Sequence, residues 1–371
     1  MRALFCLELM RKGGAERVVC NLANYFVKCG NEVAIVVTRY DKQEYVLDKR
    51  VKLFVLDEKN EKHAFRNLRR IHKLRSIIRE FNSDLIFAFL QEPIGRVLIA
   101  KTLHRDIRKI PTILSVRIDP KTAFMSIKRK MTLPLYNLAD GYVFQTKEIQ
   151  SFFNKRIQLK SVIIANSVAP SFYNTKISNK KRAKKIVSVG RLNEEKNFPM
   201  LIDAFKEIEH DFPDYTLEIF GDGPLKESLQ QCIVKSALDK KIIIRGNVDD
   251  IIGNIKNASL FVMTSNREGM SNALMEALVL GLPCISTDSA GGGAATLIEN
   301  GVNGYLVPMN DVHELATKMR TVLGDKRLSN TLSMNAEKSM KKYNPEIINE
   351  KWLDYAFKII NERHRKNDQK Y

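Results

Sequence analysis

The sequence predicts an α/β protein built from two doubly wound, parallel-stranded domains. Short apolar runs alternate with longer amphipathic segments from one end of the chain to the other. Such runs, separated by helix-length pieces, are typical of parallel strands covered on both faces. The chain has 371 residues, which is long for one hydrophobic core. Residues 169–185 are polar, basic and without periodicity, as a linker between two domains would be.

The expected strands divide evenly between the two halves of the chain. The first half offers Ala3–Leu7, Glu32–Thr38, Lys52–Leu56, Asp84–Leu90, Thr112–Val116, Gly141–Gln145 and Val162–Ala165. The second half offers Lys185–Val189, Thr216–Phe220, Ile242–Arg245, Leu260–Thr264, Pro283–Thr287 and Tyr305–Val307. We therefore expect domains at 1–170 and 180–344, then a last amphipathic helix at 345–371. Doubly wound sheets bind ligands outside the carboxyl ends of their strands, so two such domains face to face would form one deep cleft.

Composition limits the class of protein. Apolar residues make up 44% and charged residues 28%, as in soluble globular proteins. The five cysteines are scattered and never form a CxxC pair, which favours buried free thiols in a reducing compartment over disulfides or a zinc site. We find no signal-peptide pattern and no apolar run near the roughly 20 residues of a membrane span. We expect a cytoplasmic protein.

Positive charge is concentrated in the first half. Residues 1–170 hold 32 Lys and Arg against 16 Asp and Glu, whereas the remaining residues are nearly balanced. This asymmetry suggests an anionic surface as a partner. In the densest segment, Lys62–Phe81, apolar residues recur at helical spacing between cations. Two interpretations stay open: an ordinary helix packed on the sheet, or a membrane-docking face to which Lys128-Arg129-Lys130 would also belong.

Three loops carry residues suited to binding a phosphorylated ligand. Gly13-Gly14 follow the first strand and open a helix, where backbone N–H groups can approach an anion, although a plain turn explains them equally well. There is no G-x-G-x-x-G, which disfavours a dinucleotide site. Arg191 and Lys196 follow the first strand of the second half, where cations can hold a diphosphate, unless they are merely solvated.

The third loop precedes a helix that we expect from Asn272 to Gly281. Glu268 lies in the loop and Glu276 in the second turn of that helix, so both carboxylates can reach one ligand. Carboxylates accept hydrogen bonds from sugar hydroxyls, and the helix amino terminus between them offers N–H groups to phosphate. The alternative is one capping and one solvated acid, but Glu276 lies between two apolar strands and is not expected to be solvated.

Several strings in order resemble one enzyme family. They are G-G-A-E-R at 13–17, G-R-L-N-E-E-K-N-F at 190–198, G-D-G-P-L at 221–225, E-G-M-S-N-A-L-M-E-A-L-V-L-G-L-P at 268–283 and E-N-G-V-N-G-Y-L-V-P at 299–308. As a set they resemble the family 4 retaining glycosyltransferases of the GT-B fold, over almost the whole chain. Each string alone is unspecific.

The resemblance implies a role for each matching residue. Arg191 and Lys196 would neutralise the donor diphosphate, Glu276 would hold the ribose hydroxyls, and Glu268 would contact the transferred sugar. The remaining donor contacts implied are Gly13, Gly14, Gly221, Gly269, Met270, Ser271 and Asn272. The final helix would cross back onto the first domain. In such a mechanism fixed cations and helix dipoles stabilise the leaving diphosphate, and the sequence has no D-x-D triplet for a metal, so no metal cofactor is expected.

One position departs from the family. Many members carry a histidine where this chain has Arg117, within S-V-R-I-D-P, a string that resembles a subgroup of bacterial polysaccharide-assembly transferases. Arginine cannot accept a proton, so a cation there would grip a phosphate or a sugar hydroxyl instead.

We predict a retaining, metal-independent transferase that moves a hexose or N-acetylhexosamine from a nucleotide diphosphate sugar, UDP-sugars being favoured. The acceptor expected is a lipid-linked saccharide at the inner face of a bacterial membrane, with the first domain touching the anionic surface. Two alternatives remain: a GT-B-like epimerase of sugar nucleotides, and a non-catalytic α/β protein that binds an anionic surface. Nucleic acid is disfavoured because no basic, aromatic-rich platform is present.

Overall fold

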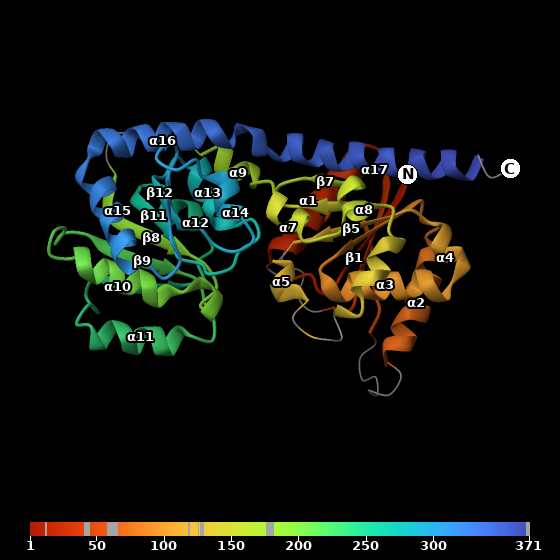
Figure 1. Cartoon of the computed structure of the whole chain (residues 1–371), viewed down its shortest axis with the longest axis horizontal. Helices are drawn as coiled ribbons and strands as arrows, with labels where there is room; N and C mark the ends of the chain where they lie inside the picture. Colours follow the sequence, from red (N-terminus) through yellow and green to blue (C-terminus); the bar gives the residue numbers. More distant parts are fainter. Residues whose placement is uncertain are drawn as a thin grey trace. The chain divides into compact units, whose positions relative to one another are not determined.

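The computed structural model describes residues 1–11, 13–40, 45–57, 66–117, 119–124, 126, 130–175 and 182–368, without the side chains of residues 122 and 366–368. These residues form two compact units (Figure 1). One unit comprises Met1–Ser167 with Glu346–Tyr371, and the other comprises Val168–Pro345. Each unit is a parallel sheet between helices.

The sheet of the first unit has the strand order β3-β2-β1-β4-β5-β6-β7, and every pairing is parallel. The order reverses between β1 and β4, which makes that pair the topological switch point of a doubly wound sheet. The strands are β1 (Arg2–Leu7), β2 (Glu32–Val37), β3 (Lys52–Val55), β4 (Leu85–Phe89), β5 (Thr112–Val116), β6 (Gly141–Phe144) and β7 (Ser161–Ile163). The helices are α1 (Gly14–Lys28), α2 (Arg66–Glu80), α3 (Gln91–Leu103), α4 (Arg105–Lys109), α5 (Pro120–Ala123), η1 (Leu133–Leu138), α7 (Lys147–Ser151), α8 (Lys155–Leu159) and α17 (Pro345–Asp368).

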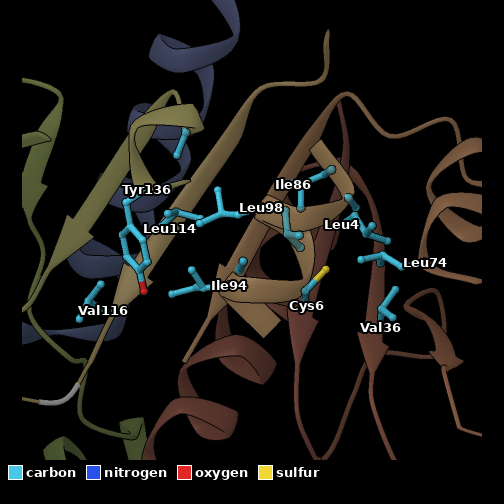
Figure 2. Close-up of a cluster of buried hydrophobic side chains, with 14 of the residues drawn as sticks. Leu4, Cys6, Val36, Leu74, Ile86, Ile94, Leu98, Leu114, Val116 and Tyr136 are labelled. Carbon is cyan, nitrogen blue, oxygen red and sulfur yellow. The ribbon is translucent and has the colours of Figure 1, made fainter. Parts of the chain in front are cut away.

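Alternate side chains of these strands build two cores, one on each face of the sheet. Leu4 and Cys6 of β1 point to the face covered by α2 and α3, where Leu74 and Leu98 pack against them (Figure 2). The intervening Phe5 points to the other face, where its ring meets Phe26 of α1 at 5.6 Å between centroids.

Helix α17 belongs to the first unit although it ends the chain. Its Trp352 is fully buried and lies 5.6 Å from Phe89 and 6.0 Å from Phe87, measured between ring centroids. The Tyr355 hydroxyl accepts from the Tyr142 backbone N–H at 3.0 Å and donates to the carbonyl of Lys160. The apolar face of α17 thus completes the core between β4 and β6.

The sheet of the second unit has the order β10-β9-β8-β11-β12-β13, again entirely parallel, with the switch point between β8 and β11. Its strands are β8 (Ala183–Val189), β9 (Thr216–Phe220), β10 (Ile242–Gly246), β11 (Ala258–Met263), β12 (Cys284–Thr287) and β13 (Tyr305–Val307). Its helices are α9 (Pro170–Tyr173), η2 (Glu194–Lys196), α10 (Phe198–Ile208), α11 (Lys226–Lys235), α12 (Ile251–Ile255), α13 (Asn272–Val279), α14 (Gly293–Leu297), α15 (Val312–Gly324), α16 (Lys326–Met340) and η3 (Lys341–Tyr343).

Both ends of the predicted linker, 169–185, form regular structure. Pro170–Tyr173 form the short helix α9 with Phe172 buried, and the Tyr173 hydroxyl donates to the carbonyl of Met340 at 3.0 Å. Strand β8 starts at Ala183, two residues before the predicted start, because Ala183 pairs with Ala258. Residues 176–181 lie outside the described residues.

Helix α2 resolves part of the question left open for Lys62–Phe81. Its apolar stripe lies in the core of the first unit, with Ile71, Leu74, Ile77 and Ile78 buried together with Phe81. Leu68 is 46% exposed. The stripe therefore packs on the protein itself, as in an ordinary α/β helix. Residues 62–65 and 128–129 lie outside the described residues.

The cysteines are free thiols, as expected, although they are not uniformly buried. Cys6, Cys20 and Cys284 are buried, whereas Cys29 is exposed and Cys232 half-buried.

Candidate functional site

The loop after β8 carries Arg191 and Lys196 at the carboxyl edge of the second sheet. Arg191 is exposed and makes no ion pair with a described residue. Lys196 ends the short 3₁₀ helix η2. Asn197 follows in the left-handed conformation (φ 45°), which asparagine tolerates better than most residues, and this turns the chain into α10.

Lys196 meets Glu268 across the switch point. Its ammonium group donates to the Glu268 carboxylate, and both side chains are only about one-fifth exposed, at 19% and 20%. The backbones of the two loops are tied as well, since Asn266 N–H donates to the carbonyl of Glu195 at 2.8 Å and the Thr264 hydroxyl donates to that of Lys196 at 2.9 Å. The fold thus joins a cation after β8 to a carboxylate after β11.

Helix α13 places the second carboxylate. Ser271 is its N-cap and its hydroxyl accepts from the Leu274 backbone N–H at 3.4 Å. Glu276, in the second turn, is 8% exposed, so the prediction that it is not a solvated residue is confirmed. The helix ends at Val279, two residues before the predicted end, and Gly281 follows with φ 55° as a left-handed C-terminal glycine.

Glycines let these loops approach one another closely. A Cβ on Gly221 (φ 140°) would collide with the carbonyl oxygen of Gly190, so the G-D-G-P-L string packs directly under the loop of Arg191. In the same way a Cβ on Gly291 (φ 104°) would meet the carbonyl of Glu268, and one on Gly293 would meet that of Gly269. Contacts this close exclude any side chain.

Gly291-Gly292-Gly293 were not among the predicted site residues. These residues follow β12 and support the backbone of Gly269 and Met270 from below. The signal was available, because three consecutive glycines begin four residues after the end of a predicted strand, at the edge where ligands bind.

In the first unit the Gly-Gly loop caps α1. Gly13 is the N-cap with extended backbone, and its carbonyl accepts from the Arg17 N–H at 3.1 Å and from the Tyr45 hydroxyl at 3.0 Å. A Cβ on Gly13 would collide with the Glu16 carboxylate, which folds back over the N-cap. Gly14, the first helical residue, is exposed.

Arg117 lies at the same carboxyl edge, after β5, and is 8% exposed. Its guanidinium donates to the Ser115 hydroxyl at 3.2 Å and to the Asn166 side-chain oxygen, and it lies 5.8 Å from the ring centroid of Phe89. Burial lowers the pKa of Arg117 to about 9, and the nearby Glu16 carboxylate opposes this shift. Burial raises the pKa of Glu16, which Arg117 in turn lowers.

The structure therefore gathers the predicted site residues in two groups. In the second unit Lys196 contacts Glu268, and Glu276 is buried in α13, the helix that follows the Glu268 loop. In the first unit Gly13 lies beside Glu16, whose charge interacts with that of Arg117. Among the described residues, no three His, Cys, Asp or Glu side chains cluster closely enough to hold a metal ion. No described helix has the length and apolar character needed to cross a membrane.

Each half of the chain matches the model of a known protein family. The family model described as Glycosyltransferase Family 4 matches residues 12–172, and that described as Glycosyl transferases group 1 matches residues 172–339. The chain is 26% identical to an α-1,4-N-acetyl-D-galactosaminyltransferase of Campylobacter jejuni named for GalNAc-α-(1→4)-GalNAc-α-(1→3)-diNAcBac-PP-undecaprenol, over 97% of this chain and 99% of that one. It is 23% identical to the amylovoran biosynthesis glycosyltransferase AmsD of Erwinia amylovora, over 93% and 96% of the two chains.

Solved structures agree on the fold. Anabaena HepE, crystallised with UDP, superposes with a TM-score of 0.81 at 21% identity, covering 95% of this chain and 99% of that one. The predicted GT-B fold and the predicted family resemblance are confirmed. With one family model covering each half, the chain belongs to the family 4 glycosyltransferases.

Proposed function

We propose that this glycosyltransferase moves a hexose or N-acetylhexosamine from a UDP-sugar to a lipid-linked saccharide during assembly of a bacterial surface polysaccharide. Two relatives support the substrate classes, since one is named for an undecaprenyl-diphosphate-linked glycan and the other for amylovoran biosynthesis. Structural neighbours hold UDP and UDP-glucose. The reaction proceeds with retention of anomeric configuration and without a metal ion.

The observation that carries this proposal is the pairing of Lys196 with Glu268 at the switch point of the second sheet. Open α/β sheets bind ligands at this point, outside the strand ends. A cation, a carboxylate and the amino terminus of α13 converge there, so one ligand can present a phosphate to the first and hydroxyls to the second.

The donor is then held by side chains with distinct chemistry. Lys196 and the exposed Arg191 neutralise the diphosphate as it leaves, because charge-assisted hydrogen bonds to phosphate strengthen as negative charge develops. Glu276 accepts from the ribose hydroxyls, and Glu268 accepts from a hydroxyl of the transferred sugar. The backbone of Gly269–Asn272 completes this pocket, and Gly221 lets the neighbouring loop pass beneath it.

In the first unit the proposed contacts are the backbone N–H groups of Gly13 and Gly14 at the start of α1, which suit a phosphate, and the guanidinium of Arg117. Arginine stays protonated at neutral pH. Arg117 therefore acts as an electrostatic contact to phosphate or a sugar hydroxyl, not as a base.

We further propose that the protein binds the inner face of the cytoplasmic membrane peripherally, through charge alone. The apolar residues of α2 from Ile71 to Ile78 are buried in the core and cannot insert into a bilayer. Arg70 is also unsuited to membrane contact, because it is 8% exposed and donates to both carboxylate oxygens of Asp57 at 2.5 Å. The remaining cations of the helix, with Arg69 exposed and Arg66 half-buried, are the proposed contacts.

Product analysis with and without acceptor tests the function. The protein is incubated with a panel of UDP-sugars, alone and with synthetic lipid-linked saccharides, and products are followed by mass spectrometry and ¹H NMR. We expect a disaccharide linkage with the anomeric configuration of the donor, and only slow hydrolysis without acceptor. A changed sugar nucleotide in the absence of acceptor would instead identify an epimerase, and no turnover in either arm would leave a binding protein.

A further inference from the structure

A buried polar network lies at the carboxyl edge of the first sheet and consists of residues that have no role in the function proposed above. It joins Glu8, which follows β1, to Thr38, which follows β2, and to Arg96 of α3, the helix that follows β4. These three strands are neighbours in the order β2-β1-β4, so the network spans the switch point of this sheet.

The three side chains form a directed chain of hydrogen bonds. Arg96 Nη1 donates to the Thr38 hydroxyl at 2.7 Å, and that hydroxyl donates to Glu8 Oε2 at 2.7 Å. Arg96 also lies 3.6 Å from Glu8 Oε2, and Arg39 lies 3.6 Å from Oε1. Thr38 is fully buried and the Arg96 side chain is 10% exposed, whereas the Glu8 side chain is 24% exposed and that of Arg39 is 58% exposed. The network is thus buried at Thr38 and Arg96, and it is accessible at Glu8 and Arg39, which form its tip.

Stability alone is a weak reason for such a network. Desolvation of two charges often exceeds their mutual attraction, so a buried ion pair can commonly be replaced by apolar residues at no cost. The turn that brings α3 to this point is also strained: Leu90, directly after β4, has φ 65°, a conformation that leucine rarely adopts. Strain and buried charge at the ligand-binding edge of a doubly wound sheet are typical of a binding site.

The chemistry of the tip indicates the class of ligand. The Glu8 carboxylate accepts one hydrogen bond from Thr38 and keeps further lone pairs for other donors. The exposed Arg39 guanidinium beside it donates. Glu8 neutralises part of the positive charge of Arg39 and Arg96 and repels a phosphate, whereas a neutral polyol can donate to the carboxylate and accept from the exposed guanidinium.

We propose that Glu8, positioned by Thr38 and Arg96, binds a hydroxyl group of the saccharide acceptor. This proposal rests on the function proposed above. The carboxylates proposed for the donor, Glu268 for the transferred sugar and Glu276 for the ribose, belong to the second unit, so a hydroxyl ligand of the Glu8 carboxylate is assigned to the acceptor. Arg96 is a positioning residue that acts through Thr38 and Glu8.

The experiment compares wild type with Glu8→Gln on a synthetic saccharide acceptor selected for wild-type turnover and on its monodeoxy analogues. The substitution keeps the shape of the side chain and removes the charge. Hydrogen bonds to charged groups are strong, so we expect the KM for the acceptor to rise roughly 10- to 100-fold. The KM for the donor and the slow donor hydrolysis without acceptor should change less than about twofold. One deoxy analogue should be a poorer acceptor than the parent saccharide for the wild type. For Glu8→Gln the two saccharides should be equally good, because the variant and the analogue each remove one partner of the same hydrogen bond.

Two further variants separate binding from folding. Arg96→Lys keeps the charge but loses the fixed geometry, so it should raise the acceptor KM without changing donor hydrolysis. The control is Asp140→Asn, which disturbs the ion pair between Asp140 and the buried Lys101. Asp140 directly precedes β6 and so lies at the amino edge of the same sheet, opposite the Glu8 network. Asp140→Asn should lower the melting temperature and leave the acceptor KM unchanged.

Each failure has its own signature. An unchanged acceptor KM in Glu8→Gln, or a deoxy penalty that persists in that variant, overturns this inference while transfer by the wild type still supports the proposed function. A fall in melting temperature together with equal rises in the donor KM and the acceptor KM means that the network is structural only. If the wild type transfers sugar to no saccharide, the proposed function fails and this inference falls with it.

Discussion

At the scale of single residues, Lys196 and Glu268 stabilise each other at the proposed donor site. Each side chain is mostly buried, and each would be costly to bury alone. By pairing, they restrict each other's conformations, which favours the proposed binding of a diphosphate and a sugar hydroxyl. Preorganisation of this kind reduces the reorganisation needed when charge develops on the leaving group.

We expect Lys196→Ala and Glu276→Ala each to lower kcat/KM by about 10²–10³, because each removes a charged contact to the donor. Steady-state kinetics with the donor varied measures the loss, and circular dichroism checks the fold. Lys184→Ala is the matched control, since Lys184 pairs with Asp214 in the same unit but both side chains are more than half exposed. Either variant retaining half of the wild-type kcat/KM contradicts the assignment.

Arg117 and Glu16 give a pH-dependent prediction. Burial raises the pKa of Glu16 and Arg117 counteracts this, so Arg117→Ala should raise that pKa further. When the pKa of a carboxyl group is higher in the folded state than in the unfolded state, the protein loses stability as the pH rises from the unfolded pKa through the folded pKa. Arg117→Ala should therefore be more destabilised, relative to wild type, at pH 7.5 than at pH 4.5. Urea denaturation at the two pH values measures this difference.

The double variant Arg117→Ala/Glu16→Gln is the control, because it should lose most of the added pH dependence. For activity we expect Arg117→Lys to retain part of kcat and Arg117→Ala very little. Wild-type turnover by Arg117→Ala would show that the residue serves only the fold.

At the scale of elements, the sequence predicted the bounds of the strands better than it predicted the packing of the helices around them. Thr112–Val116, Thr216–Phe220 and Tyr305–Val307 have the predicted bounds, because short apolar runs between polar turns have few alternative interpretations. The helical period of 66–81 could not decide what the apolar stripe packs against, since the same period serves a core and a membrane.

The sequence alone could not predict which residues far apart along the chain contact one another. Lys196 and Glu268 are 72 positions apart, and their pairing follows from the adjacency of β8 and β11. The motif strings nevertheless marked both residues. Glu8, Thr38 and Arg96 belong to no motif, so only the fold brought them together.

The glycines after β12 support a prediction about a loop. Gly291→Ala and Gly293→Ala should each force the backbone of Glu268 and Gly269 to move, because a Cβ would strike their carbonyl oxygens. We expect donor affinity to fall at least tenfold and stability to fall by about 1–3 kcal/mol. Isothermal titration with UDP and thermal unfolding measure the two effects. Gly324→Ala is the control, since a Cβ there meets no atom within 4 Å; equal behaviour of all three variants would contradict the role of this loop.

At the scale of the whole molecule, the chain's own cations are proposed to replace a metal. Turnover should therefore survive excess EDTA within about twofold, because Lys196 and Arg191 neutralise the leaving diphosphate by fixed charge. Activity is measured after dialysis against EDTA, then with Mg²⁺ or Mn²⁺ restored. A known metal-dependent glycosyltransferase run in parallel verifies that the chelator acts. Strict dependence on either ion contradicts the mechanism.

The uneven charge of the chain leads to the last prediction. Residues 1–170 carry a net charge of +16, and each Lys or Arg near an anionic leaflet contributes roughly 1 kcal/mol to binding. Sedimentation with liposomes should rise with the fraction of anionic lipid and fall with added salt, since exposed charges are screened over about 8–10 Å. With the apolar stripe of α2 buried, binding should be fully reversed by high salt.

The variant that tests the surface neutralises Arg66, Arg69 and Lys73 and leaves Arg70 in place, because Arg70 holds Asp57. Its matched control neutralises Lys206, Lys235 and Lys240, which are exposed on the second unit. We expect the first variant to pellet with anionic liposomes several-fold less than wild type while binding UDP normally. The control loses the same number of charges, so a drop in both variants indicates attraction through net charge alone. Equal pelleting of the α2 variant and wild type rules out α2 as the membrane contact.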